Sequence, residues 1–119
     1  MRLVVLIALT LFICGCTDKS GIPGNVIPKN TMELILWDMI KADRFTAQYI
    51  LKDSLFKNVD STRFALYESI FALHDVRSAE FKESFEFYLA RPDITRVMFD
   101  SISAKANRRR NEIDTAVLK

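Results

Sequence analysis

Glycine is scarce in this chain and confined to its first part. The three glycines are Gly15, Gly21 and Gly24, and none occurs from Asn25 to Lys119. Phosphate-binding loops, dinucleotide-binding turns and the nucleophile elbow of hydrolases all need glycine where the backbone turns tightly or approaches a ligand. Tight β-hairpins also depend on Asn-Gly or Asp-Gly turns. The sequence therefore excludes these enzyme classes and disfavours a β-rich fold.

Cysteine and histidine are equally scarce. The two cysteines, Cys14 and Cys16, lie in or next to the apolar opening segment, and His74 is the single histidine. The rest of the chain has no thiol for a disulfide or a thiolate metal site, and one histidine cannot form a histidine cluster for zinc. We therefore expect a domain that is stabilised by packing, with no metal and no cofactor.

The chain also lacks a strong charge of either sign. It has 17 lysines and arginines and 15 acids, and Arg2 belongs to the opening segment. Such a balance produces no field that attracts nucleic acid. With 50% hydrophobic residues and nine phenylalanines, the chain has enough apolar side chains for the core of one small domain.

Residues 1–15 have the profile of a secretory signal peptide. Arg2 supplies a positive charge, an apolar run extends from Leu3 to Cys14, and the first acid is Asp18. The run is shorter than the roughly 20 residues that a transmembrane helix needs. We therefore expect this segment to be cleaved off.

The sequence Ile13-Cys14-Gly15-Cys16 resembles the lipobox of bacterial lipoproteins. The resemblance implies that the Cys16 sulfur receives a diacylglycerol, that cleavage follows Gly15, and that the new amine is acylated. Two or three acyl chains hold a protein stably on a membrane, whereas one chain does not. In enterobacterial lipoproteins Asp after the cysteine retains the protein at the inner membrane; Thr17 here favours the outer membrane, with the domain facing the periplasm. An ordinary signal peptide with two incidental thiols, or a buried apolar helix, is the alternative.

The segment that follows is polar and contains two glycines and two prolines, which is typical of an irregular tether. We therefore divide the chain into a signal peptide at 1–15, an acylated cysteine with a flexible tether at 16–29, and a helical domain at 30–119.

Apolar spacing of three and four residues predicts an all-α fold, a small bundle of about four helices. The first helix is expected from a cap at Asn30, with Glu33 as the reciprocal acid, to about Leu51. The second should span about 61–74, with Asp60 or Ser61 as its cap.

The third helix is expected from a cap at Ser78 to about Ala90, because Pro92 disfavours helix at Arg91. A fourth should begin at Pro92 and continue, with weaker periodicity, toward the end of the chain. The side chains expected to face inward are Met32, Ile35, Leu36, Met39, Ile40, Phe45, Tyr49 and Ile50, then Phe64, Tyr67, Ile70, Phe71 and Leu73, then Phe81, Phe85 and Tyr88, and last Ile94, Val97, Met98, Ile102 and Ala106.

Few side chains invite a catalytic interpretation. His74, Asp75 and Ser78 contain the residue types of a hydrolase triad, but a helix end, a turn and a helix cap explain them more simply. Asp38 lies among apolar residues, so burial would require a hydrogen-bonded partner, and we expect it to be structural. Asp43 is five residues further on and is not expected to share its face.

Arg108, Arg109 and Arg110, with Lys105, form the one basic run of the chain. Glu112 and Asp114 follow at once, so a solvated helix end is the simpler interpretation. If the run is functional, it would bind lipid phosphate, lipopolysaccharide or an acidic protein surface.

Four aromatic residues fall within eight positions of the third expected helix. Phe81, Phe85 and Tyr88 share one face, whereas Phe87 points away from it. Either neighbouring helices cover this helix on two sides, which we favour, or Phe87 belongs to a partner surface.

Four patterns carry a family resemblance: Ile27-Pro28-Lys29 with Asp38, Tyr67-x-x-Ile70-Phe71-x-x-His74, Phe81-x-x-Ser84-x-x-x-Tyr88 and Phe99-Asp100-x-Ile102. With them the chain resembles an uncharacterised lipoprotein family of Bacteroidota, which has a small helical domain behind a lipobox. The resemblance implies a helical fold in the cell envelope and transfers no catalytic residue.

We therefore expect a non-enzymatic domain, lipid-anchored through Cys16, that binds an envelope protein or peptide. Its oligomeric state stays open. A helical domain that binds a small ligand or glycan is the alternative, with Asp38 and His74 as its pocket; Phe87 and Arg108 to Arg110 are the other candidate contact residues.

Overall fold

The computed structural model describes residues 21–52 and 58–118, which form four α-helices and one π-helical turn without any strand. The predicted all-α fold is confirmed. The elements are α2 (Lys29–Phe45), η2 (Thr46–Ile50), α3 (Val59–Leu73), α4 (Ser78–Leu89) and α5 (Pro92–Val117). The predicted signal peptide and Cys16 lie outside the described residues.

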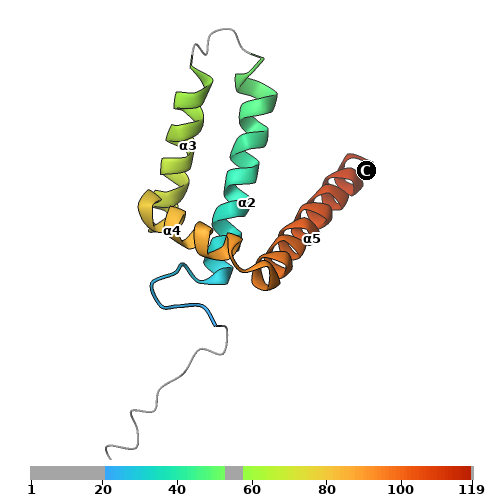
Figure 1. The fold of residues 1–119 in the computed structure, drawn as a ribbon. Helices are drawn as coiled ribbons and strands as arrows, with labels where there is room; N and C mark the ends of the chain where they lie inside the picture. Colours follow the sequence, from blue (N-terminus) through green and yellow to red (C-terminus); the bar gives the residue numbers. More distant parts are fainter. Residues whose placement is uncertain (1–20, 53–57, 119) are drawn as a thin grey trace, which may run out of the picture.

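The four helices form the predicted small bundle, which opens into a V away from its base. Figure 1 shows α2 and α3 side by side as an antiparallel pair, the short helix α4 across their base, and α5 rising from the base and diverging from α2. Helix α2 contacts both α3 and α5, while α4 joins α3 to α5. One side of α2 is therefore covered along its length, and the other is covered mainly near its first turns.

The hydrophobic core lies at the base, where all four helices meet. Met32 and Ile35 of α2, Tyr88 of α4 and Met98 of α5 are fully buried there. The other buried members of the cluster are Val26, Ile27, Leu36, Phe71 and Ile102. Helical spacing in the sequence identified most of these residues, because each helix turns one stripe toward the base.

The predicted inward positions outside this base are partly wrong. Phe64, Leu73 and Val97 are 66%, 75% and 55% exposed. Helical spacing marks a stripe along the whole helix, whereas a neighbouring helix covers only part of that stripe. Phe45 and Tyr49 are also exposed, and their rings contact each other with centroids 5.2 Å apart.

Residues 26–28, which the sequence placed in the tether, are part of the folded domain. Val26 and Ile27 are only 9% and 3% exposed. The N–H of Ile27 donates to Oγ of Ser84 at 2.9 Å, and the hydroxyl of Tyr88 donates to the carbonyl of Ile27 at 2.7 Å. Because buried backbone groups must be hydrogen-bonded, these two α4 side chains allow Ile27 to be buried. The domain therefore begins before residue 30.

The N-terminal caps of the first two helices differ from those predicted. Helix α2 starts two residues earlier than a cap at Asn30 implies, and the N–H of Met32 donates to the carbonyl of Pro28, so Asn30 is not the cap. Helix α3 is capped by Asn58, whose Oδ1 accepts from the N–H of Ser61 at 3.0 Å. Asn58 has the same capping chemistry as the predicted Asp60 and Ser61, whereas α2 begins after Pro28 without a side-chain cap.

The later helix ends agree better with the sequence. Helix α4 begins at Ser78, although Ser78 is its first residue and not its cap. Helix α5 begins with Pro92 and carries Asp93 in its first turn, as predicted. It continues to Val117, so the weakly periodic end of the chain is helical.

A Schellman motif ends α3 and sets the direction of the chain into α4. The N–H of Val76 donates to the carbonyl of Phe71 at 2.9 Å, and that of Asp75 to Ala72 at 3.2 Å. Asp75 takes the left-handed position with φ of 55°. Glycine usually fills this position, and Asp tolerates it better than most residues.

Replacing Tyr88 with Phe tests whether the contact with Ile27 holds the N-terminal segment. Burial and the nearby Glu33 raise the pKa of Tyr88, so its hydroxyl stays protonated and donates. Without it the buried carbonyl of Ile27 loses its partner, and we expect the free energy of unfolding to fall by about 1–3 kcal/mol. Urea denaturation followed by circular dichroism measures this; Tyr49→Phe, at an exposed ring, should cost almost nothing. Equal stability of the two variants would contradict the assignment.

Candidate functional site

Asp38 joins α2 to the end of α3. Its Oδ2 accepts from Nε2 of His74 at 2.7 Å, and its Oδ1 lies 2.6 Å from Nζ of Lys41. The side chains of Asp38 and His74 are 20% and 14% exposed. Burial acts to raise the pKa of Asp38, but the hydrogen bonds from Lys41 and His74 outweigh it and lower that pKa. Asp38 is therefore an ionised link between two helices.

The three triad-like residues do not form a hydrolase site. His74 directs Nε2 at Asp38, whereas Asp75 is the left-handed residue of the turn and Ser78 opens α4. Within the part of the chain that the structure describes, no hydrogen bond connects His74 with the side chain of Asp75 or Ser78. A nucleophile needs its base within hydrogen-bond reach, so this geometry has no activated serine.

The other acids of α2 also fasten it to its neighbours. Asp43 accepts from the hydroxyl of Tyr67 on α3 at 2.7 Å. Burial, with the hydrogen bond to Asp43, raises the pKa of Tyr67 to about 12. Glu33 does not complete a capping box; it pairs with Lys29 at 2.8 Å and accepts from Ser101 on α5 at 3.2 Å. Asp38 and Asp43 thus both turn toward α3 despite their spacing of five.

A shallow hollow lies beside Asp38, between α2 and α3. Its volume is about 400 Å³, and it is open to solvent. Its lining residues are Asp38, Lys41, Ala42, Phe45, Leu66, Ser69, Ile70 and Leu73. His74 does not line it, so the two polar residues expected to share a pocket share a hydrogen bond instead.

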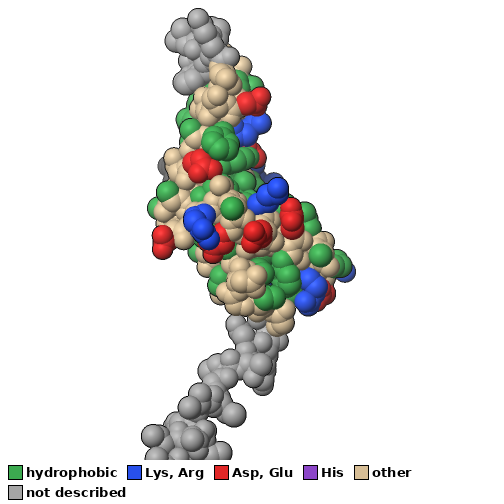
Figure 2. Space-filling model, turned by 60° about the vertical axis from the view of Figure 1, so that its left-hand side comes forward, with side chains coloured by type: hydrophobic (Ala, Val, Ile, Leu, Met, Phe, Trp, Pro, Cys, Tyr) green, Lys and Arg blue, Asp and Glu red, His purple; other side chains and the backbone are tan. Residues whose placement is uncertain are grey.

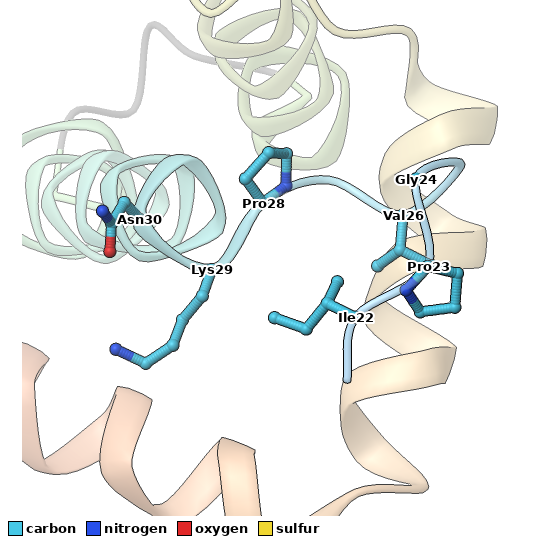
Figure 3. A pocket seen from close by; sticks show the side chains of 7 residues that line it. All are labelled: Ile22, Pro23, Gly24, Val26, Pro28, Lys29 and Asn30. Carbon is cyan, nitrogen blue, oxygen red and sulfur yellow. The ribbon is translucent and has the colours of Figure 1, made fainter. Parts of the chain in front are cut away.

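A second hollow lies at the N-terminal segment and has a volume of about 340 Å³. Figure 3 shows residues 22–29 curving round it, with Ile22 pointing across toward Lys29. Lys29 is its only charged lining residue, and its ammonium is paired with Glu33. This hollow therefore has no group of converging polar side chains.

A third, more enclosed hollow of about 350 Å³ lies between α2 and the second half of α5. We call it the basic cleft. Its lining residues are Trp37, Ile40, Lys41, Arg44, Ala106, Asn107, Arg109, Arg110, Ile113 and Asp114. The ammonium groups of Lys41 and Lys105 lie 6.0 and 5.8 Å from the centroid of the Trp37 ring, within cation–π range.

Only part of the basic run from Arg108 to Arg110 lines the basic cleft. Arg109 and Arg110 line it, whereas Arg108 does not. Among residues 21–52 and 58–118, no carboxylate forms an ion pair with Arg44, Arg109 or Arg110. All three arginines are exposed, as expected of a solvated helix end, and one of the acids that follow the run, Asp114, also lines the cleft.

Trp37 is the site residue that the sequence argument missed. Trp37, Lys41 and Arg44 nevertheless have the spacing of one helix face. Arg109 and Ile113 show the same spacing on α5. This pattern was readable in each helix, but only the fold shows that the two faces oppose each other.

The aromatic residues of α4 mostly pack within the fold. Phe81 lies between Phe71 and Phe85, with ring centroids 4.9 and 5.6 Å away. Phe87 is half-buried against the core, and its ring meets Tyr88 edge-on at 5.6 Å. Neighbours therefore cover α4 on more than one side, and Phe87 is not part of an exposed aromatic patch.

Over α3 and α4 the surface carries charges of both signs. Figure 2 shows acidic and basic side chains interspersed there, with apolar side chains between them. Within the described residues, no three His, Cys, Asp or Glu side chains gather as a metal site would require. No helix in the same residues is long and apolar enough to cross a membrane.

Comparison with known proteins identifies the family. The sequence profile of a domain of unknown function (DUF4296) matches residues 23–112. The match covers most of the chain, so the chain belongs to this family. No curated protein and no solved structure matches it. The profile begins at residue 23, in agreement with an N-terminal segment that packs into the core.

Replacing Asp38 with Asn tests the link between α2 and α3. The loss of an ionised acceptor for His74 and Lys41 should lower the free energy of unfolding by about 1–3 kcal/mol at pH 7. Because the folded-state pKa of Asp38 lies below its ordinary 3.8, the stabilisation is fully present above about pH 5 and is lost as the pH falls through that lowered pKa. Denaturation at several pH values should show the difference from the native chain closing in acid.

The matched control is Asp100→Asn, at an exposed carboxylate of α5. It should change stability little at any pH. A difference for Asp38→Asn that stayed constant down to pH 2 would show that its carboxylate charge does not stabilise the fold.

Proposed function

We propose that this member of the DUF4296 family is a lipoprotein of the bacterial cell envelope that binds a protein or peptide partner without catalysis. Cys16 would carry the lipid, the outer membrane would hold it, and the domain would face the periplasm. The lipobox-like sequence around Cys16 and the resemblance to Bacteroidota lipoproteins support this location.

The observation that supports a binding role is the basic cleft. It is concave, lies between two helices that diverge, and combines an aromatic ring and aliphatic side chains with cationic groups. Protein interfaces typically combine a buried aromatic or aliphatic centre with a polar rim. The surface therefore has the composition of a docking site.

Catalysis has less support. The two side chains with the best claim to acid–base chemistry, Asp38 and His74, are bound to each other and hold α2 against α3. Their hydrogen bond accounts for both residues without a substrate. We therefore propose no reaction for this domain.

A domain that binds a small ligand or glycan is the second candidate. That hypothesis placed its pocket at Asp38 and His74, where the structure has a hollow open to solvent that His74 does not line. The basic cleft, at about 350 Å³, is at the lower end of the volumes typical of ligand pockets. A protein partner, which needs no deep cavity, agrees better with these surfaces.

Cys16→Ala tests the anchor. Without the thiol no diacylglycerol can be attached, and we expect the protein to leave the membrane fraction while its circular dichroism spectrum stays helical. Fractionation of cells by centrifugation, with detection of the protein in each fraction, measures this. Cys14→Ala is the matched control and should remain in the membrane fraction; a Cys16→Ala protein that sedimented equally with the envelope would refute the lipid anchor.

Crosslinking in intact cells of the native organism tests the partner. Lys41 and Lys105 border the basic cleft, and Lys82 lies on α4, so an amine-reactive crosslinker samples separate faces. We expect mass spectrometry to find one envelope protein joined repeatedly to this chain. Crosslinks only within the chain or between its copies would refute the binding role.

A further inference from the structure

We infer that the basic cleft binds an acidic, amphipathic segment of another envelope protein, with Trp37 as its apolar floor. This inference rests on the proposed binding function and names the chemistry of the partner. It is argued from the charges of the cleft, its apolar surface and its place in the fold.

The charges of the cleft favour an anionic partner. Four cationic side chains line it, and Asp114 is the only carboxylate among its lining residues. Lys41 is partly neutralised by Asp38 at 2.6 Å. Arg44, Arg109 and Arg110 form no ion pair within the described part of the chain. Arg110 donates to Oδ1 of Asn107 at 3.4 Å, and carboxylates of a bound segment would add charged acceptors for the three guanidinium groups.

The apolar part of the cleft favours a segment that also has aliphatic side chains. Trp37 and Ala106 are partly covered, while Ile40 and Ile113 are 41% and 55% exposed on opposite walls. A free phosphate or a purely acidic chain would leave these walls in contact with water. An amphipathic segment can cover them with one face and direct its carboxylates at the arginines.

The charge of the chain argues against a second copy of it binding in the basic cleft. The part of α5 that borders the cleft carries Lys105 and the three arginines from Arg108 to Arg110. Placing the same segment of another copy in the cleft would bring like charges together, which opposes binding. Like charge therefore opposes a dimer in which two clefts face each other, and an acidic segment of a partner complements the cleft better.

The position of the cleft favours a protein over lipid phosphate. Figure 1 shows that the blue segment at the start of the described chain lies below the base of the V, whereas α2 and α5 rise away from the base. Arg109 lies 17 residues after Pro92, which corresponds to about 25 Å along α5. With Cys16 only five residues before Gly21, at most about 18 Å of chain separates the anchor from the domain. The cleft therefore lies toward the end of the domain opposite the N-terminal segment that would carry the anchor.

The test uses the single tryptophan of the chain as its reporter, since Trp37 lies in the cleft. Lipidated protein in phosphatidylcholine vesicles is titrated with a synthetic helical peptide of Leu and Glu, and with the same peptide carrying Lys for Glu. We expect the acidic peptide to change Trp37 fluorescence saturably, with affinity that falls as salt rises. The Lys peptide should have no such effect.

Two double variants of equal charge separate the cleft from general electrostatics. Arg109→Gln with Arg110→Gln removes two cleft cations and should weaken binding by about tenfold. Arg96→Gln with Arg108→Gln removes two exposed arginines of the same helix that do not line the cleft, and binding should change by less than about twofold.

Several outcomes would overturn the inference. They are an equal loss of affinity in both double variants, an equal response to the Lys peptide, or no response to the acidic peptide. A fluorescence change with phosphatidylglycerol vesicles or inorganic phosphate, without one for the peptide, would assign the cleft to a phosphate group instead. None of these results removes the proposed function, which fails separately if crosslinking in cells finds no envelope partner.

Discussion

The structure depends on the backbone hydrogen bonds of one buried residue that lies just before the first helix. Ile27 can be buried because Ser84 and Tyr88 bond its N–H and its carbonyl. These two residues are four apart on α4, so they lie on the same helix face. Their contacts bring α4 under the start of α2, and the buried side chains from all four helices meet at that point. This junction therefore fixes the N-terminal segment and α4 against each other at the centre of the core.

Because the hydrophobic core lies at one end of the helices, side-chain hydrogen bonds hold them together further along their length. Asp38 with His74 and Asp43 with Tyr67 fasten α2 to α3. Between α2 and α5, the bond from Ser101 to Glu33 lies near the base. Helix α5 can therefore diverge from α2, and the space between them becomes the basic cleft. The polar bonds of α2 thus decide which of its faces is closed and which is open.

Much of the candidate site was present in the sequence as separate signals. The basic run and the role of Asp38 as a hydrogen-bonded, structural acid were recognisable from residue type and neighbours. The partners were not, because His74 is 36 positions from Asp38 and spacing carries no information on such a contact. For the same reason the sequence could not separate Arg109 and Arg110 from Arg108, or place Trp37 opposite them.

Local sequence by itself determined that the chain is helical and where most helices begin and end. These conclusions depend on glycine, proline and the apolar period, which act within a few residues. Only the tertiary structure decided that residues 26–28 belong to the domain, that Phe64 is exposed while Met98 is buried, and that two cationic helix faces meet at Trp37. Which side chains are buried, and which helix faces lie opposite each other, depends on which helices become neighbours. The hydrogen bonds of Ile27 and the packing at the base determine those neighbours.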